Sequence, residues 1–157
     1  MDIFLLLQVH FTMRLKNKIV LCRDMQMVLK FLRKVDRTLP VPLSERVDLE
    51  KFARSSVGNT VHAIVLEGDI LSAALVVYGF QDRPSAYLNL LATVPGCEGR
   101  GYAGQLMDAA EAAAREAGMT EFHLHTNAVN TRAAGFYERR GYRVLETQPK
   151  LHMAKQL

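Results

Sequence analysis

A glycine-rich segment, Gly99-Arg100-Gly101-Tyr102-Ala103-Gly104, joins an apolar stretch to a long helical pattern. The N-terminus of a helix offers unpaired N–H donors and a partial positive charge, and small residues let a phosphate group approach those donors closely. The segment is therefore a candidate phosphate-binding loop. No Lys-Ser/Thr pair follows it, which excludes a nucleotide-binding P-loop. A tight connection between a strand and a helix, without a ligand, is the alternative that this segment alone leaves open.

Two segments resemble the signature segments of the GCN5-related N-acetyltransferase (GNAT) superfamily. The stretch LLATVPGCEGRGYAGQLM at 90–107 resembles the acetyl-CoA loop of that family, [QR]-x-x-G-x-[GA]. The stretch NTRAAGFYERRGY at 130–142 resembles its N-x-x-A-x-x-x-Y-x-x-x-G-[FY] segment, and the two occur in the family's order. One residue departs from the pattern, because Glu98 stands where Gln or Arg is usual. A carboxylate beside a pyrophosphate is unfavourable unless it points away.

The resemblance implies an α/β fold, in which a mixed and mostly antiparallel sheet splays between its fourth and fifth strands. It also implies an acetyl-CoA-dependent N-acetyltransferase that acts directly on an amine, without a metal. By the same resemblance Tyr137 protonates the departing CoA sulfur; a core aromatic is the alternative role. Asn130 would contact the cofactor, or serve only as a helix cap. The implied cofactor-binding residues are Leu91, Ala92, Thr93, Gly99, Arg100, Gly101, Tyr102, Ala103, Gly104 and Asn130.

His125 is the second predicted catalytic residue. A primary amine with a pKa of about 10 is almost wholly protonated at neutral pH, so its attack on a thioester needs a base. His125 lies five residues before Asn130, where some members of the family place a glutamate base, and an imidazole titrates near neutral pH. An ordinary residue at a strand end is the alternative. His123 shares its strand face by period-two spacing, but the sequence shows no third ligand for a metal ion.

The identity of the acceptor amine is not encoded in any motif. A small-molecule amine, an amino sugar and a protein N-terminus all fit. By the resemblance, the acceptor amine binds on the side of the molecule that is walled by the loop Arg37 to Arg46 and by the final hairpin. A different class of function is a module of the same fold that binds acyl-CoA without turnover, as a sensor or partner, although the intact Tyr137 argues against it. A homodimer is open as an oligomeric state.

Helices must position these residues, and apolar side chains at helical spacing predict four of them. The predicted helices are residues 25–35, a shorter helix that starts at Asp48, residues 103–117 and residues 130–140. Asp24, Asp48 and Asn130 are suitable N-caps. Two prolines between 38 and 43 must separate the first two helices, because proline lacks the N–H that a helix interior needs.

Strands alternate with these helices. The predicted strands are residues 17–22, 60–66, 70–80, 86–94, 120–126, 142–147 and 150–156. The segments from 60 to 94 are rich in β-branched and aromatic residues and are separated by turn residues, which predicts three antiparallel strands joined by tight turns. The full order is β-α-α-β-β-β-α-β-α-β-β, which agrees with the resemblance over residues 17–157.

Composition favours one globular domain. The chain has 157 residues, of which 49% are hydrophobic and 23% charged, enough for one core and too apolar for a disordered protein. We expect residues 17–157 to form this domain and residues 1–16 to be a peripheral extension, with Met13 as an alternative start. The apolar run 3–7 is too short to span a membrane and lacks the flanks of a secretion signal, so we expect a cytoplasmic protein without membrane contact.

The net charge of +4 is concentrated at one end of the chain. Residues 1–57 hold eleven Lys or Arg against six Asp or Glu. Nucleic acid binding would need aromatic side chains among these charges, and the first helix has only Phe31, at a position expected to be buried. We therefore interpret the charges as the solvated face of an amphipathic helix and expect no nucleic acid partner.

Overall fold

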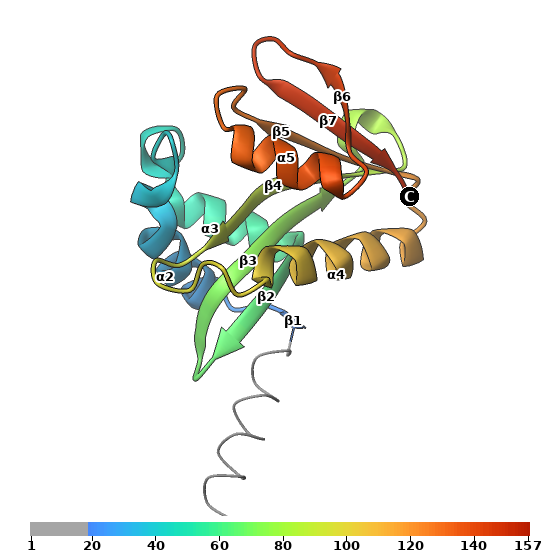
Figure 1. The fold of residues 1–157 in the computed structure, drawn as a ribbon. Coiled ribbons are helices and arrows are strands. Elements are labelled where there is room, and N and C mark those ends of the chain that lie inside the picture. Colours follow the sequence, from blue (N-terminus) through green and yellow to red (C-terminus); the bar gives the residue numbers. More distant parts are fainter. Residues whose placement is uncertain (1–18) are drawn as a thin grey trace, which may run out of the picture.

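A seven-stranded mixed sheet forms the centre of the computed structural model, which describes residues 19–157 (Figure 1). The strands lie in the order β1-β2-β3-β4-β5-β7-β6, and residues 1–16, the predicted extension, lie outside the described residues. The strands are β1 (Ile19–Leu21), β2 (Thr60–Leu66), β3 (Asp69–Tyr78), β4 (Ser85–Thr93), β5 (Glu121–Thr126), β6 (Arg143–Glu146) and β7 (Leu151–Gln156). The helices are α2 (Met25–Val35), α3 (Leu49–Gly58), α4 (Tyr102–Glu116) and α5 (Thr131–Arg139).

The order of helices and strands is the predicted one, and the three predicted N-caps are confirmed. The Asp24 carboxylate accepts hydrogen bonds from the backbone N–H groups of residues 26 and 27 at the start of α2. Asp48 accepts from the N–H of Lys51 in α3, and the Asn130 side chain from that of Ala133 in α5. These bonds satisfy backbone donors that a helix leaves unpaired in its first turn.

The connection between β3 and β4 differs from the predicted tight turn. The sequence pattern extends the third strand to residue 80, whereas β3 ends at Tyr78. Gly79 adopts a left-handed conformation with φ of 83°, and Gln81 and Asp82 also have positive φ. Gly79 is the N-cap of a short 3-10 turn, η3 (Phe80–Asp82), and the Phe80 ring stacks on Tyr87 of β4. Apolar composition could not show this break, because Phe80 is as compatible with a strand as with a turn.

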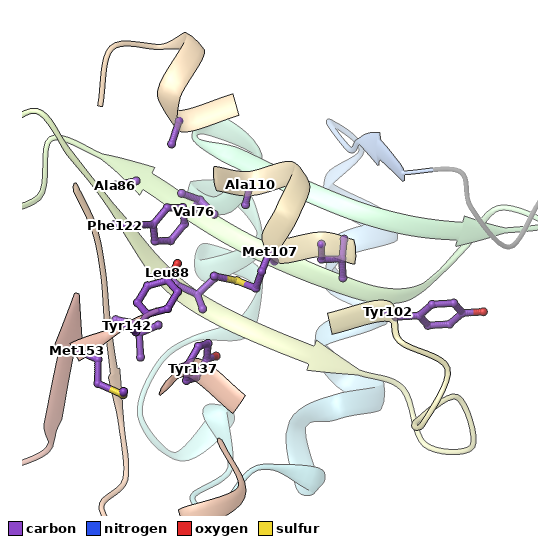
Figure 2. Packing of buried hydrophobic residues seen from close by; sticks show 14 of the residues in the cluster. Val76, Ala86, Leu88, Tyr102, Met107, Ala110, Phe122, Tyr137, Tyr142 and Met153 are labelled. Atoms are coloured by element: carbon purple, nitrogen blue, oxygen red, sulfur yellow. The ribbon is translucent and has the colours of Figure 1, made fainter. Parts of the chain in front are cut away.

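Two hydrophobic clusters lie on opposite faces of the sheet, because successive residues of a strand point to opposite sides. In β3, Ala74 and Val76 belong to the cluster under α4, and Ala73 and Leu75 to the cluster under α2 and α3. Figure 1 shows α4 crossing one face of β2, β3 and β4, with α2 and α3 on the other side. The cluster under α4 continues to α5, and Figure 2 shows Tyr137 at its edge.

The middle of the sheet contains its one parallel pairing among the described strands. β4 and β5 pair over four residue pairs, from Ser85 with Glu121 to Leu88 with Leu124. The register of β3 against β4 shifts at the same place, because Leu75 pairs with Leu90 and Val76 with Leu88, which leaves Asn89 as a bulge. A bulge bends a strand and redirects its side chains. The expected separation of the fourth and fifth strands therefore begins after Leu88.

The basic helix α2 is amphipathic, as expected. Phe31 is 1% exposed, so its ring is not available for stacking on a nucleic acid base.

Both cysteines have free thiols. Among residues 19–157, no helix combines the length and the apolar character needed to cross a membrane.

Truncation of a buried leucine of β5 is expected to cost far more stability than the same truncation on β6. Leu124 is 1% exposed and Leu145 is 52% exposed. We expect Leu124→Ala to lower the free energy of unfolding by about 2–5 kcal/mol, because it leaves a cavity, and Leu145→Ala by less than about 0.5 kcal/mol. Urea denaturation followed by circular dichroism measures both changes. Equal losses would contradict the burial of β5 and the exposure of β6.

Candidate functional site

A cleft of about 250 Å³ lies where β4 and β5 separate. The ends of both strands, the linker between α2 and α3, the first two turns of α5 with the loop before it, and the residue that precedes β7 form its walls. The lining residues are Leu39, Pro40, Val41, Arg46, Leu88, Asn89, Leu90, Leu91, His125, Thr126, Asn127, Asn130, Ala133, Tyr137 and Lys150. The location follows from the short parallel pairing, because β5 no longer covers the edge of β4 beyond Leu88.

The cleft brings together both predicted catalytic residues and two of the predicted cofactor-binding residues. These four are Leu91, His125, Asn130 and Tyr137. Ala92 and Thr93 do not line it; they pair with Ala73 and Ser72 of β3. The Ser72 hydroxyl lies 3.1 Å from the Ala92 carbonyl oxygen and 2.8 Å from the Thr93 hydroxyl. The segment Gly99–Gly104 also lies outside the lining and leads from β4 into α4.

The loop before α4 differs from the start of the other long helices. Gly101 occupies the N-cap with φ of 77°, and no side chain caps the helix. Within the described part of the chain, no acceptor is bonded to the N–H groups of Tyr102, Ala103 or Gly104. Gly96 and Gly99 also have positive φ, so the loop bends at three glycines. The arrangement leaves several donors at the positive end of a 15-residue helix, which is the chemistry that an anion needs.

Glu98, the residue that departs from the family pattern, turns back on its own loop. Its Oε2 atom accepts a hydrogen bond of 2.9 Å from the N–H of Gly96. The carboxylate therefore accepts from an N–H group at the beginning of the loop, rather than from those at the start of α4. The Arg100 guanidinium also reaches back, to the carbonyl oxygen of Gly96 at 3.4 Å.

The same loop has the G-x-G-x-x-G spacing of dinucleotide-binding sites at Gly99, Gly101 and Gly104. In such sites an acidic residue about 20 positions further on binds the ribose of the nucleotide. The acidic residue at that distance is Glu121, which lies at the opposite end of β5 from the cleft and bonds to His123 and Arg83. The cleft end of β5 carries Thr126 instead, so the spacing alone does not make a dinucleotide site.

Tyr137 lies in the second turn of α5, on the side that faces the sheet. Its ring packs edge-on against Tyr142 at 5.7 Å between centroids, and Figure 2 shows both rings in the cluster that includes Leu88. Burial raises the pKa of the Tyr137 hydroxyl to about 12, although Arg140 opposes this change. The side chain is 8% exposed and still reaches the cleft. Tyr137 is thus a core aromatic that also lines the cleft.

His125 is held by residues of two neighbouring strands. The Tyr87 hydroxyl of β4 lies 2.8 Å from its Nδ1 atom. His152, its direct partner in β7, stacks on its ring at 4.5 Å between centroids and an interplanar angle of 21°. Because Nδ1 bonds to the hydroxyl, Nε2 is the ring nitrogen left to act on a ligand in the cleft.

A hydrogen-bonded chain continues from His152 toward the far end of β5. His152 Nε2 and His123 Nδ1 are 2.9 Å apart, and His123 Nε2 lies 2.9 Å from a carboxylate oxygen of Glu121. Bonding to His123 and the charge of Arg83 lower the pKa of Glu121, so this carboxylate is an acceptor. His123 then donates from Nε2 to Glu121. When both rings are neutral, its Nδ1 accepts from His152 Nε2, and the chain fixes the tautomer of each ring.

The electrostatics of the cleft favour an uncharged His125. Partial burial lowers its pKa, and the charges of Lys150 and His123 lower it further, while Glu146 opposes them. The pKa of His152 is also lowered, by burial and by the two other histidines. Although His152 joins His123 and His125, the described residues contain no group of three or more side chains arranged to hold a metal ion.

Several residues of this site were not predicted from the sequence. Tyr87 and His152 are far from His125 in the chain, and only the register of β4, β5 and β7 brings them together. Lys150 lies in the final hairpin, which the sequence assigns to the acceptor side without singling out a residue. Asn89 was detectable in principle, because a polar residue interrupts the apolar run AYLNLLAT of β4, and such an interruption is typical of a bulge.

Comparison with known proteins agrees with this geometry. The model of the acetyltransferase (GNAT) family matches residues 29–142. Ard1 from Thermoplasma volcanium is similar over 89% of this chain and 97% of its own, with a TM-score of 0.71 and 17% identity. The PaiA N-acetyltransferase from Thermoplasma acidophilum, in complex with coenzyme A, is similar over 89% of this chain and 99% of its own, with a TM-score of 0.66 and 14% identity.

A third similar structure is a GNAT family acetyltransferase from Elizabethkingia anophelis with acetyl-CoA bound. It is similar over 68% of this chain and 82% of its own, with a TM-score of 0.59 and 12% identity. At these identities the likeness shows the fold. The family match extends from α2 to Tyr142, the third residue after α5, and so includes the splayed strands and both signature segments. This chain therefore belongs to the GNAT family of acetyltransferases.

Proposed function

We propose that the protein transfers an acetyl group directly from acetyl-CoA to an amine bound in the cleft. The observation that carries this proposal is that His125 and Tyr137, a base and an acid by chemical type, line one cleft beside a free strand edge. Transfer to an amine needs a proton removed from the nucleophile and a proton delivered to the sulfur. The cleft offers one side chain for each task.

The residues present fit acetyl-CoA at two places. The three uncapped N–H groups at Tyr102, Ala103 and Gly104 suit a pyrophosphate, with Glu98 turned back toward Gly96. The edge of β4 beyond Leu88 is not paired with β5, so backbone groups around Leu91 can bond to the amides of pantetheine. When bound, acetyl-CoA supplies an activated acetyl thioester. Asn130, which caps α5 and lines the cleft, would lie beside it.

Tyr137 is the proposed acid. Since burial raises its pKa to about 12, its hydroxyl stays protonated at neutral pH and can donate to the sulfur as the C–S bond breaks. The ring is fixed by Phe136 and Tyr142, with centroid distances of 5.1 and 5.7 Å, so the position of the hydroxyl is well defined. A fixed donor acts without a further loss of side-chain freedom.

His125 is the proposed base. Its lowered pKa keeps the imidazole neutral at neutral pH, so that Nε2 can accept the proton that the amine loses. The Tyr87 hydroxyl at Nδ1 and the stacked ring of His152 hold the imidazole in one orientation. For Nε2 to accept, the neutral ring carries its own proton on Nδ1, and this N–H donates a hydrogen bond to the Tyr87 hydroxyl oxygen.

Acetyl-CoA is expected to raise the melting temperature of the protein, because a ligand that binds only the native state stabilises it by mass action. Gly101→Val should abolish this increase, since a β-branched residue does not adopt the φ of 77° that the loop requires. Gly118→Val is the matched control, with φ of 85° at the other end of α4. Both variants should melt lower than the parent. An unchanged acetyl-CoA effect in Gly101→Val would refute the position of the phosphate site.

Tyr137→Phe separates chemistry from binding, because it removes only the hydroxyl. Its affinity for acetyl-CoA should stay near that of the parent, while kcat falls by about 10²- to 10⁴-fold. Calorimetry and steady-state rates measure the two quantities. Tyr142→Phe is the control: this buried tyrosine donates to Glu111 and does not line the cleft, so turnover per folded molecule should be kept. Full turnover in Tyr137→Phe would exclude the acid role. Acetyl-CoA binding by the parent with no turnover of any amine would favour the sensor function instead.

The rate of acetylation should depend on pH through His125. With a base that takes the proton from a bound ammonium group, kcat/KM of the parent rises as the imidazole loses its proton and then levels off. Because the pKa of His125 is lowered, the midpoint of this rise should lie below the ordinary pKa of an imidazole, about 6.5. In His125→Gln the rate should be lower and should keep rising until the free amine itself loses its proton. Parallel pH profiles for parent and variant would rule out His125 as the base.

A further inference from the structure

The charged residues that line the cleft have one sign. Arg46, from the linker between α2 and α3, and Lys150, from the loop before β7, both line it. Asp and Glu are absent from the lining formed by the described residues. An amine acceptor is a cation near neutral pH, so two further cations in its binding site oppose its entry unless another part of the acceptor attracts them.

Neither cation is neutralised within the part of the chain that the structure describes. The ion pairs there are formed by other residues, such as Lys30 with Asp69 and Arg140 with Asp108. Arg46 and Lys150 are both exposed. Their charges are therefore available to a ligand.

The phosphates of the cofactor do not explain these two residues. The proposed pyrophosphate loop, Gly99–Gly104, does not line the cleft, whereas Leu91 and Tyr137 of the proposed thioester region do. Lys150 is also close enough to His125 to lower the pKa of its imidazole. The positive charge therefore lies where the amine would meet its base, on the acceptor side of the cleft.

We propose that the acceptor is a small primary amine that also carries an oxyanion, either a carboxylate or a phosphate. This inference rests on the proposed acetyl transfer and narrows its substrate. Arg46 and Lys150 would bind the oxyanion through charge-assisted hydrogen bonds, and a guanidinium suits two oxygens at once. Leu39, Pro40 and Val41 line the cleft with them, which favours an acceptor with an apolar body. Polyamines, which carry only positive charge, are disfavoured by the same residues.

The test compares amines that differ in the oxyanion. Phenylalanine is paired with phenethylamine, which lacks the carboxylate, and glucosamine 6-phosphate with glucosamine; spermidine represents the polyamines. Initial rates with saturating acetyl-CoA are measured at pH 8, where His125 is neutral in every variant. Calorimetry with the protein–CoA complex measures binding of the same amines without turnover. We expect the oxyanion to raise kcat/KM and affinity about tenfold or more in at least one pair.

Variants connect this preference to the two cations. Arg46→Gln and Lys150→Gln should each raise KM for the member that carries the oxyanion by about tenfold or more, with little change in kcat and little change for its partner without the oxyanion. Lys51→Gln is the control, since this exposed cation of α3 does not line the cleft. The carboxylate and phosphate pairs show which oxyanion the site prefers.

The outcomes separate this inference from the transfer function. Faster acetylation of the members without the oxyanion, or of spermidine, would overturn the inference and leave the transfer function in place. A preference for the oxyanion that survives in both cleft variants would also overturn it. If no amine is acetylated, the transfer function fails, but calorimetry still tests the oxyanion site. Binding that depends on the oxyanion and is lost in Arg46→Gln supports the site. Equal binding of both members of each pair overturns it.

Discussion

The short contact between β4 and β5 is the constraint on which the rest of the molecule depends. The two strands pair over four residue pairs and stop at Leu88 and Leu124, beside the unpaired Asn89. Beyond this point β4 continues against β3, and β5 continues against β7, so the sheet stays bonded on both sides of the opening. A parallel pairing that continued to the strand ends would leave neither a free backbone edge nor room for a ligand.

The opening has two kinds of wall, and His125 lies between them. On the proposed cofactor side, Tyr137 belongs to the same hydrophobic cluster as α4, and its position is set by that core. On the proposed acceptor side, Arg46 and Lys150 come from a linker and a loop and are exposed. His125 is fixed from a third direction, by Tyr87 and His152 on the adjacent strands. The proposed acid and base thus have rigid supports, whereas the proposed oxyanion contacts do not.

Local signals in the sequence predicted most of the elements but few of the contacts at the site. Helix caps such as Asp24 and Asp48 act within one turn, so residue type and spacing are sufficient to find them. The grouping of Tyr87, His125 and His152 depends on strand register, which no single segment encodes. The break after Tyr78 arises from left-handed backbone at Gly79, Gln81 and Asp82, two of which are not glycine, so composition did not reveal it.

The proposed acceptor side of the cleft is formed by a linker and a loop rather than by a helix or strand, and this has a consequence for how the sequence can change. Val41 and Lys150 are exposed, so their replacement breaks no buried packing, whereas any change at Tyr137 also alters the core. With the acceptor placed as proposed, changes in the linker before α3 and the loop before β7 would alter acceptor binding without disturbing the core that holds Tyr137. Structures with TM-scores of 0.66 and 0.71 at 14% and 17% identity show how far sequences diverge around this frame. Those two segments are where relatives with different substrates should differ first.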